Sequence, residues 1–141
     1  MSADCLFCGI VDGEIPGRIV YEDDVTVAFL DVNPLARGHT LVVPKAHRER
    51  VNDLDPSEAG PVFRAVATVS AAVEAAVDAP ATTVAINNGQ AAGQEVPHLH
   101  VHVVPRWPGD GAGPIHGLFG DRPDLDDAEM DEIEAEIGAE L

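Results

Sequence analysis

Lysine is almost absent from this sequence, because Lys45 is the only lysine among eight basic residues, against 25 aspartates and glutamates. The formal net charge is −17, so the surface should repel nucleic acid, and we expect no nucleic-acid partner. A solvated acidic shell suits a cytoplasm of very high salt, where the Debye length falls to about 3 Å near 1 M and self-repulsion is screened. We therefore expect a halophilic source, with a GC-rich genome as the alternative explanation.

Cysteine is scarce as well, since Cys5 and Cys8 are the only two in the chain. A disulfide framework is thereby excluded, and a C-x-x-C pair inside a cell indicates metal ligands or redox thiols. The segment MSADCLFCGI lacks the basic start and long apolar run of a signal peptide. No apolar stretch approaches the about 20 residues of a membrane span, so we expect a cytoplasmic protein without a membrane partner.

One domain is expected over residues 1–141, because this length allows one compact core and is too short for two ordinary domains. Apolar residues make up 45% of the chain, which argues against disorder despite the charge. The core should span residues 5–108, and residues 109–141 should form an irregular segment and an acidic C-terminal helix. We expect a narrow apolar stripe on that helix to dock on this chain or on a partner subunit. The stripe comprises Met130, Ile133, Ile137 and Leu141.

The core pattern predicts five strands and one long helix. The expected strands are 18–22, 25–31, 39–44, 82–87 and 98–104. A capping Asp55, a proline at the first helical position and Glu58 three residues beyond the cap predict a helix that continues to about Val77. Short connections between most strands favour an antiparallel meander, so the predicted class is α+β with a five-stranded antiparallel sheet.

The segment 98–104 alternates histidine with apolar residues. On a strand, the period of two puts His98, His100 and His102 on one face, about 6.6 Å apart along the chain. Three of the six histidines fall within five residues, which favours a functional site over unrelated polar contacts. Two chemistries could use this row: a neutral imidazole can attack phosphorus, or the three imidazoles can bind a metal ion.

The loop 87–96, which leads directly into the histidine row, favours attack on phosphorus. Its glycines, Gly89 and Gly93, allow backbone N–H groups to approach a phosphate closely. Its side-chain amides can donate hydrogen bonds to phosphate oxygens. We therefore expect a phosphate to bind between this loop and the histidines.

These motifs resemble the histidine triad (HIT) superfamily of nucleotide hydrolases and transferases. The resemblance rests on His-Leu-His-Val-His-Val-Val at 98–104, preceded by Ala-Gly-Gln-Glu-Val-Pro, and covers about Cys5 to Pro108. The N-terminal half adds the motifs CLFCGI, EIP, YEDD, AFLDVNP and GHTLVVPK. It implies a HIT-like fold and a homodimer formed through the helix and an edge strand.

The resemblance also implies roles for the histidines. His100 would be the nucleophile, with its other nitrogen held by a main-chain carbonyl. His102 would contact the phosphate or the leaving group, and His39 and His98 would complete the cluster. Asp31 would accept hydrogen bonds from ribose hydroxyls, although it could instead only cap a turn.

The rest of the nucleotide would lie in two further parts of the implied site. An apolar slot for a purine base is formed by Phe7, Ile10, Phe29, Val32 and Leu41, of which Phe29 and Leu41 could simply be core residues. The phosphate is held by Asn87, Gly93, Gln94, Glu95 and Val96. Glu95 stands where several family members have Ser or Thr, so we expect backbone N–H groups to act there. The available counter-charges are Arg37, Lys45 and Arg106.

A structural zinc site is implied by the same resemblance. Some family members complete the Cys5 and Cys8 pair with a histidine after the Pro-Lys segment and with the first triad histidine, which are here His47 and His98. Two thiolates and two imidazoles suit zinc, and His100 would stay free for attack. The alternative is a pair of reduced, buried thiols.

The expected activity is hydrolysis at the α-phosphorus of purine nucleoside phosphoramidates or related nucleotide conjugates. It would proceed through a nucleotidyl-histidine and need no catalytic metal. Dinucleoside polyphosphate hydrolysis is the alternative within this chemistry. From other classes, a nucleotide-binding regulatory protein with vestigial catalysis and a zinc hydrolase with three histidine ligands remain open.

Overall fold

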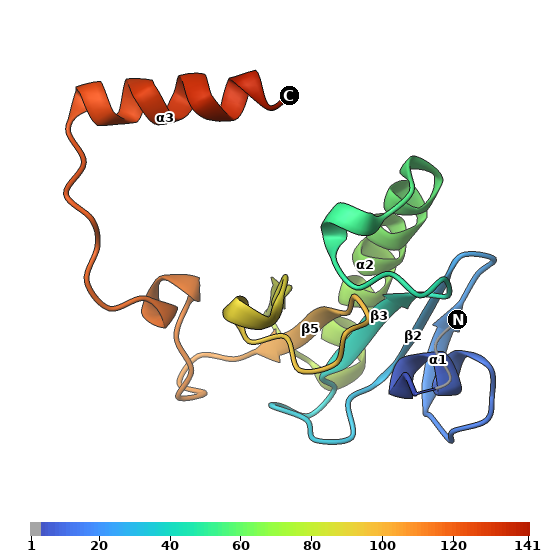
Figure 1. The fold of residues 1–141 in the computed structure, drawn as a ribbon. Coiled ribbons are helices and arrows are strands. Elements are labelled where there is room, and N and C mark those ends of the chain that lie inside the picture. The colour runs from blue at the N-terminus through green and yellow to red at the C-terminus, as the bar shows by residue number, and fades with distance from the viewer. Residues whose placement is uncertain (1–3) are drawn as a thin grey trace. The chain divides into compact units, whose positions relative to one another are not determined.

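A five-stranded antiparallel sheet organises the chain, whose computed structural model describes residues 4–141 (Figure 1). The described chain divides into two compact units, one ending at Asp110 and the other spanning Gly111–Leu141. All five strands lie in the first unit. Their bounds are β1 Ile19–Glu22, β2 Thr26–Leu30, β3 Thr40–Pro44, β4 Ala81–Ala85 and β5 Val101–Arg106.

The strand order is β1-β2-β3-β5-β4, and every neighbouring pair is antiparallel. The predicted α+β class with a five-stranded antiparallel sheet is therefore confirmed, but the order departs from that of a simple meander. After β3, the long helix takes the chain to the far edge of the sheet, where β4 forms the edge strand, and the place next to β3 is left for β5. β5 then returns between β3 and β4, and Leu41 of β3 lies opposite His102.

The strand that carries the histidine row begins later than the sequence predicts. β5 begins at Val101, not at residue 98, because the preceding backbone bonds elsewhere: the Leu99 N–H donates to the Arg48 carbonyl at 2.6 Å. The alternation is nevertheless retained from His100 onward. Val101 packs in the core under the long helix, whereas His100 and His102 line a cavity on the other face.

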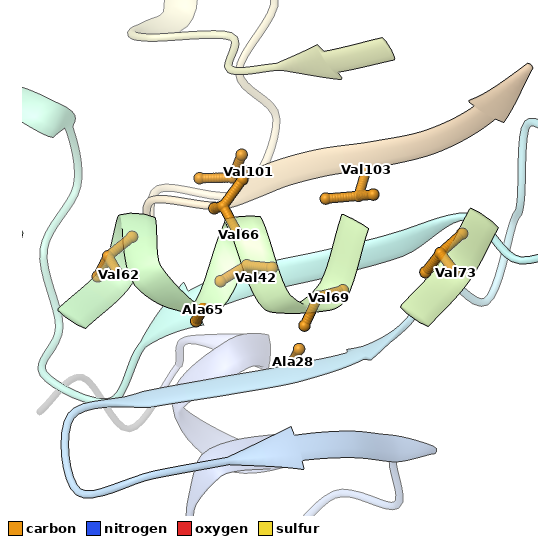
Figure 2. Close-up of a cluster of buried hydrophobic side chains, with 9 residues drawn as sticks. All are labelled: Ala28, Val42, Val62, Ala65, Val66, Val69, Val73, Val101 and Val103. Atoms are coloured by element: carbon orange, nitrogen blue, oxygen red, sulfur yellow. The ribbon is translucent and has the colours of Figure 1, made fainter. Parts of the chain in front are cut away.

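The two faces of the sheet are covered by different helices. The long helix α2, Pro56–Val77, packs against a core dominated by valine and alanine (Figure 2). The other face is covered by α1, Leu6–Val11, whose Phe7 and Ile10 pack on residues of β2 and β3. Both faces are apolar, so β3 is buried along its whole length. Helix α1 was not predicted, since one and a half turns are too few to show a helical period.

Helix α2 begins as its sequence predicts. The Asp55 carboxylate accepts the Ser57 N–H at 3.0 Å, and Glu58 accepts the Asp55 N–H at 2.7 Å, which closes a capping box. With 22 residues and a mean hydropathy of 1.3, α2 is long and apolar enough to span a membrane, contrary to our expectation that no segment is. One such helix is weak evidence for a span, because a core helix of this kind has the same composition.

The second unit contains a 3₁₀ turn at Ile115–Leu118 and the helix α3, Asp127–Ala139. The α3 cap is another closed box, in which Asp126 accepts the Glu129 N–H at 2.8 Å and Glu129 accepts in return. Every residue of α3 is exposed, including the predicted apolar stripe. The acidic C-terminal helix is therefore present, and its apolar residues Met130, Ile133 and Ile137 are not covered by other residues of the second unit.

Candidate functional site

A cavity of about 520 Å³ opens on the α1 face of the sheet. It has an apolar part beside α1 and β2 and a polar part that contains three imidazoles. The structure places in its lining the predicted residues Phe7, Ile10, Phe29, Asp31, Val32, His39, Leu41, Asn87, Gly93, Glu95, Val96, His100 and His102. Two predicted residues, His98 and Gln94, do not line it.

His100 presents one nitrogen to this cavity. Its Nδ1 lies 2.8 Å from the His98 carbonyl oxygen, which can only accept, so Nδ1 carries the proton and donates. The neutral ring then keeps a lone pair on Nε2. Burial to 9% exposure and an edge contact with the Phe7 ring at 5.1 Å hold the imidazole in place. His100 thus has the tautomer that a nitrogen nucleophile needs.

A second pair of imidazoles forms a directed chain of hydrogen bonds. The Leu35 N–H donates to His39 Nδ1 at 3.0 Å, so the His39 proton is on Nε2. That Nε2 lies 2.9 Å from His102 Nδ1 and donates to it. The proton of neutral His102 is consequently on Nε2, next to His100, whose ring centroid is 5.0 Å away. The chain leaves His102 ready to donate where His100 attacks.

Burial keeps His39 and His102 neutral at neutral pH. Desolvation lowers the pKa of His102 to about 4, helped by the nearby His100 and His39 and opposed by Asp31. Desolvation also lowers the pKa of His39, again against Asp31. The tautomers assigned above require neutral rings. An imidazole protonated on both nitrogens could not accept the hydrogen bond that Leu35 N–H donates to His39 or the one that His39 donates to His102.

Asp31 lies at the edge of the histidine cluster. One carboxylate oxygen accepts the Asn33 N–H at 2.9 Å, so the residue does cap a turn. The other oxygen is 3.7 Å from His39 Nε2. Because the carboxylate also lines the cavity, capping and contact with a bound hydroxyl are compatible.

The loop 87–96 folds around its own glutamine. The Gln94 side chain accepts the Gly89 N–H at 2.8 Å and donates to the Glu49 carbonyl at 2.7 Å. It therefore braces the loop and does not reach the cavity. Gly89 and Gly93 have φ values of +103° and +102°, a conformation that favours glycine. Among the described residues, no hydrogen bond is donated by the backbone N–H groups of Glu95 and Val96, and both residues line the cavity.

The expected counter-charges lie elsewhere. Lys45 pairs with Glu22 at 2.8 Å, and Arg106 pairs with Asp110 at 2.8 Å. Arg37 lines a groove beside α2 on the opposite face of the sheet. Within the described part of the chain no lysine or arginine lines the cavity, so our expectation was wrong. A phosphate there would rely on backbone and imidazole N–H groups.

His98 belongs to a separate cluster with the two cysteines. Its Nε2 donates to the Pro44 carbonyl at 2.8 Å, which turns the Nδ1 lone pair toward Cys5 Sγ at 3.4 Å and Cys8 Sγ at 3.5 Å. His47 Nδ1 lies 3.2 Å from Cys8 Sγ. All four ligand atoms are within 4.8 Å of one another.

This donor set fits a tetrahedral zinc ion. Zinc bonds of usual length put sulfur and nitrogen ligand atoms about 3.6 Å apart, close to the separations found. The bond from His98 Nε2 to a carbonyl is the usual support for a ligating imidazole. Desolvation lowers the pKa of His98 to about 4, so the ring is neutral, as a ligand must be.

The three histidines of the row do not form one ligand set. Among the described residues, the second group of close donor atoms is Asp31, His39 and His102, and it does not include His100. In this group, His39 Nε2 and His102 Nδ1 are 2.9 Å apart, as a hydrogen-bond donor and its acceptor are, and not as two ligands of one metal ion. A zinc hydrolase with His98, His100 and His102 as ligands is therefore not supported.

Several lining residues were missed from the sequence. They are Leu6, Ile15, Pro16, Gly17, Leu30, Asn33 and Leu35. Leu6 begins α1 and Leu30 ends β2, and the other five lie in loops, where no periodic pattern marks which way a side chain faces. The EIP motif contains Ile15 and Pro16, so it was the sequence feature that could have identified these two lining residues.

The sheet, the histidine cluster and the adjacent glycine loop define a HIT protein, and comparison with known sequences agrees. The family model described as the HIT domain matches residues 12–109, so this chain belongs to the HIT family. A HIT family protein of Bacillus subtilis has a solved structure that is 35% identical, with a TM-score of 0.89 over 98% of this chain and 97% of that one.

Two further relatives bear on metal and activity. A zinc-bound histidine triad family protein from Mycobacterium smegmatis is 38% identical, with a TM-score of 0.68 over 86% of this chain and 84% of that one. An adenylylsulfatase of Arabidopsis thaliana, HINT3, is 40% identical over 106 residues, which are 75% of this chain and 54% of the relative. The matched region in the second case is about half of the relative's length.

Proposed function

We propose that this chain hydrolyses purine nucleoside phosphoramidates or related nucleotide conjugates at the α-phosphorus, with His100 as the nucleophile. One observation carries the proposal: His100 Nδ1 donates to the His98 carbonyl, which leaves the Nε2 lone pair free in a cavity that Glu95 and Val96 also line. The apolar walls of that cavity suit a purine base, and Asp31 suits the ribose hydroxyls. The adenylylsulfatase relative acts, by its name, on an adenylyl conjugate, which supports this substrate class.

In the first step the His100 Nε2 lone pair forms a bond to phosphorus, and the bond from phosphorus to the leaving amine breaks. The amine takes up a proton relayed from solvent through His102 Nε2. In the second step water attacks the phosphorus, the bond to His100 breaks, and the proton of the water returns to solvent. The N–H groups of Glu95 and Val96 donate to the phosphoryl oxygens as their charge develops.

Mass spectrometry of the quenched reaction tests this proposal. An adenosine phosphoramidate is mixed with excess enzyme and stopped in alkali, where a phosphorus–nitrogen bond to histidine survives. We expect an adduct of one nucleoside monophosphate on the peptide that contains His100, and none in His100→Ala. Turnover without an adduct, or an adduct on another residue, would refute the proposal.

Two other functions use the same cavity. A dinucleoside polyphosphate hydrolase would form the same adduct but prefer two linked nucleotides, so competition between the two substrates ranks them. A nucleotide-binding regulator would bind a nucleoside monophosphate without turnover. The tautomer of His100 favours an enzyme, since binding alone needs no free imidazole lone pair.

Zinc is proposed for the cluster of Cys5, Cys8, His47 and His98, where it would stabilise the fold and take no part in the reaction. The fit of the four ligand atoms and the zinc-bound relative support it. Elemental analysis of the purified protein should find about one zinc per chain. Protein that folds fully without metal would contradict this role.

We also propose a cytoplasmic, halophilic homodimer. The exposed Val84 on edge strand β4 and the exposed Phe63 on α2 offer an apolar surface for a second copy. The net charge of −17 supports the halophilic source. If the source is halophilic, the melting temperature should rise with potassium chloride concentration. A protein that is most stable without salt would refute the halophilic source.

A further inference from the structure

The stretch 47–51 joins a candidate metal ligand to the loop 87–96. Its first residue belongs to the Cys/His cluster, which comprises Cys5, Cys8, His47 and His98. Two residues after His47, the Glu49 carbonyl accepts a hydrogen bond from the Gln94 side chain at 2.7 Å. A short piece of backbone therefore connects the Cys/His cluster with the support of the loop.

A second bond ties this stretch to the other histidine of the Cys/His cluster. The Arg48 carbonyl accepts the Leu99 N–H at 2.6 Å. Arg48 follows His47 and Leu99 follows His98, so the bond joins the residues next to the two candidate histidine ligands. A metal ion that binds both imidazoles would therefore hold these two backbones side by side.

The loop 87–96 packs directly against the rest of the stretch. The Asn88 side chain accepts the Val51 N–H at 2.9 Å. A Cβ added at Gly89 would lie 2.6 Å from a guanidinium nitrogen of Arg50, so the loop backbone lies against this side chain. The position of the loop therefore depends on the position of the stretch.

Gln94 connects the stretch to the part of the loop that lines the cavity. Its buried side chain accepts the Gly89 N–H at 2.8 Å and donates to the carbonyls of Glu49 and Val96, at 2.7 and 3.0 Å. Glu95 and Val96, the next two residues, line the cavity. One amide group thus joins the stretch to the residues beside which a phosphate is expected.

We propose that a metal ion in the Cys/His cluster strengthens phosphate binding in the cavity, with Gln94 as the positioning residue between the two. The ion would hold His47, and the backbone that follows would hold the Gln94 amide and the end of the loop that lines the cavity. The inference rests on the proposed function for the position of the phosphate, beside Glu95 and Val96. It does not depend on attack by His100.

Zinc affinity tests this coupling without a turnover assay. Coupling between two sites is reciprocal, so a bound phosphate must tighten zinc binding by the same factor. The affinity is measured by competition with a chelator, for the full chain alone, with adenosine and with adenosine 5′-monophosphate. Each ligand is present at the same multiple of its dissociation constant, which cancels the gain that any ligand of the folded chain gives. The excess effect of the monophosphate is the contribution of the phosphate.

Gln94→Met removes the amide and leaves the charge unchanged. Gln90→Met is the matched control, because Gln90 is exposed on the same loop. In the unsubstituted chain and in Gln90→Met, we expect the monophosphate to raise zinc affinity about fivefold or more beyond the effect of adenosine. In Gln94→Met the effects of the two ligands should differ by less than about twofold.

Equal effects of the two ligands in the unsubstituted chain would overturn the proposal, and would mean that the ion pair of Arg48 and Glu58 alone holds the stretch 47–51. An excess effect of the monophosphate that persists in Gln94→Met would overturn it too. Both results leave the proposed function untouched. A chain that binds adenosine as tightly as its monophosphate would have no phosphate site and would contradict the proposed function as well.

Discussion

His98 and His100 are separated by one residue, yet the structure places them in two different sites. The His98 ring turns toward two thiols and has its Nε2 bound to a carbonyl, so its lone pair points into a cluster of metal-ligand type. The His100 ring has its Nδ1 bound to a carbonyl, so its lone pair points into the cavity. The same type of side chain thus joins the cysteine cluster or lines the cavity, depending on which of its two ring nitrogens donates to a backbone carbonyl.

The carbonyl that fixes His100 is that of His98 itself. A contact that holds His98 in place therefore also positions the His100 ring. The cluster of His98 with Cys5 and Cys8 is thus linked through one backbone carbonyl to the imidazole that lines the cavity. Substitution of either histidine tests the comparison.

Substitution of the two histidines should break different properties. His100→Ala should lower turnover by at least about 10³-fold, because the proposed nucleophile is lost, and leave zinc content unchanged, with only the loss of stability that a small buried cavity causes. His98→Ala should remove zinc and lower the free energy of unfolding by about 4 kcal/mol or more. Zinc analysis, calorimetry and single-turnover kinetics on both variants would show this, and a His98→Ala protein with full zinc and stability would contradict it.

Removal of the hydrogen-bond donor behind His102 should have the next largest effect. His39→Phe leaves His102 Nδ1 without its partner, so the tautomer is no longer fixed and kcat should fall about 100-fold. His39→Gln places an amide donor near the lost Nε2 and should restore part of kcat, while KM changes little in either variant. Equal losses in the two variants would mean that His39 acts only through packing.

Acid should destabilise the protein through the cavity histidines. The folded pKa of His102 is about 4, below its ordinary value, so between about pH 6.5 and pH 4 the unfolded chain binds more protons than the folded one. Stability is therefore complete above this window and is lost as the pH falls through it. Denaturant unfolding across the window measures the slope, which should be smaller in His102→Gln. An equal slope in both proteins would assign the effect to other groups.

The smallest expected effect concerns Glu95, which lines the cavity and is exposed. Its negative charge would oppose the proposed anionic substrate, because no lysine or arginine is among the described residues that line the cavity. Glu95→Ser should lower KM about two- to fivefold, because an exposed charge of this kind contributes little. Glu95→Asp keeps the charge and should leave KM unchanged. A Glu95→Ser variant with a higher KM would mean that the carboxylate helps to bind.

The histidine row shows how far the sequence predicts this fold. Alternation correctly put His100 and His102 on one face, because both positions belong to a regular ladder or its edge. His98 also lies on the α1 side of the sheet, in ring contact with Phe7, but its ring turns into the cluster with Cys5 and Cys8. The strand does not extend to it, because the adjacent Leu99 N–H bonds to the Arg48 carbonyl. That partner is far away in sequence, and no local period can reveal it.

The order of the strands could not be predicted from the sequence, for a related reason. The pattern marked each strand, but the choice of β5 over β4 as the partner of β3 depends on how α2 covers the sheet. Helix α1 was not predicted, because Leu6–Val11 is shorter than two turns and shows no helical period. Charge was misjudged as well: Lys45 and Arg106 are close in sequence to site residues, yet their ion pairs hold them elsewhere.

The nitrogen protonation of the three histidines tests the account most directly. Long-range ¹H–¹⁵N correlation spectra of ring-labelled protein at pH 7 report which nitrogen of each imidazole carries its proton. We predict the proton on Nδ1 for His100 and on Nε2 for both His98 and His102. A His100 ring with its proton on Nε2 would have its only lone pair on Nδ1, toward the His98 carbonyl and away from the cavity, and would contradict the account.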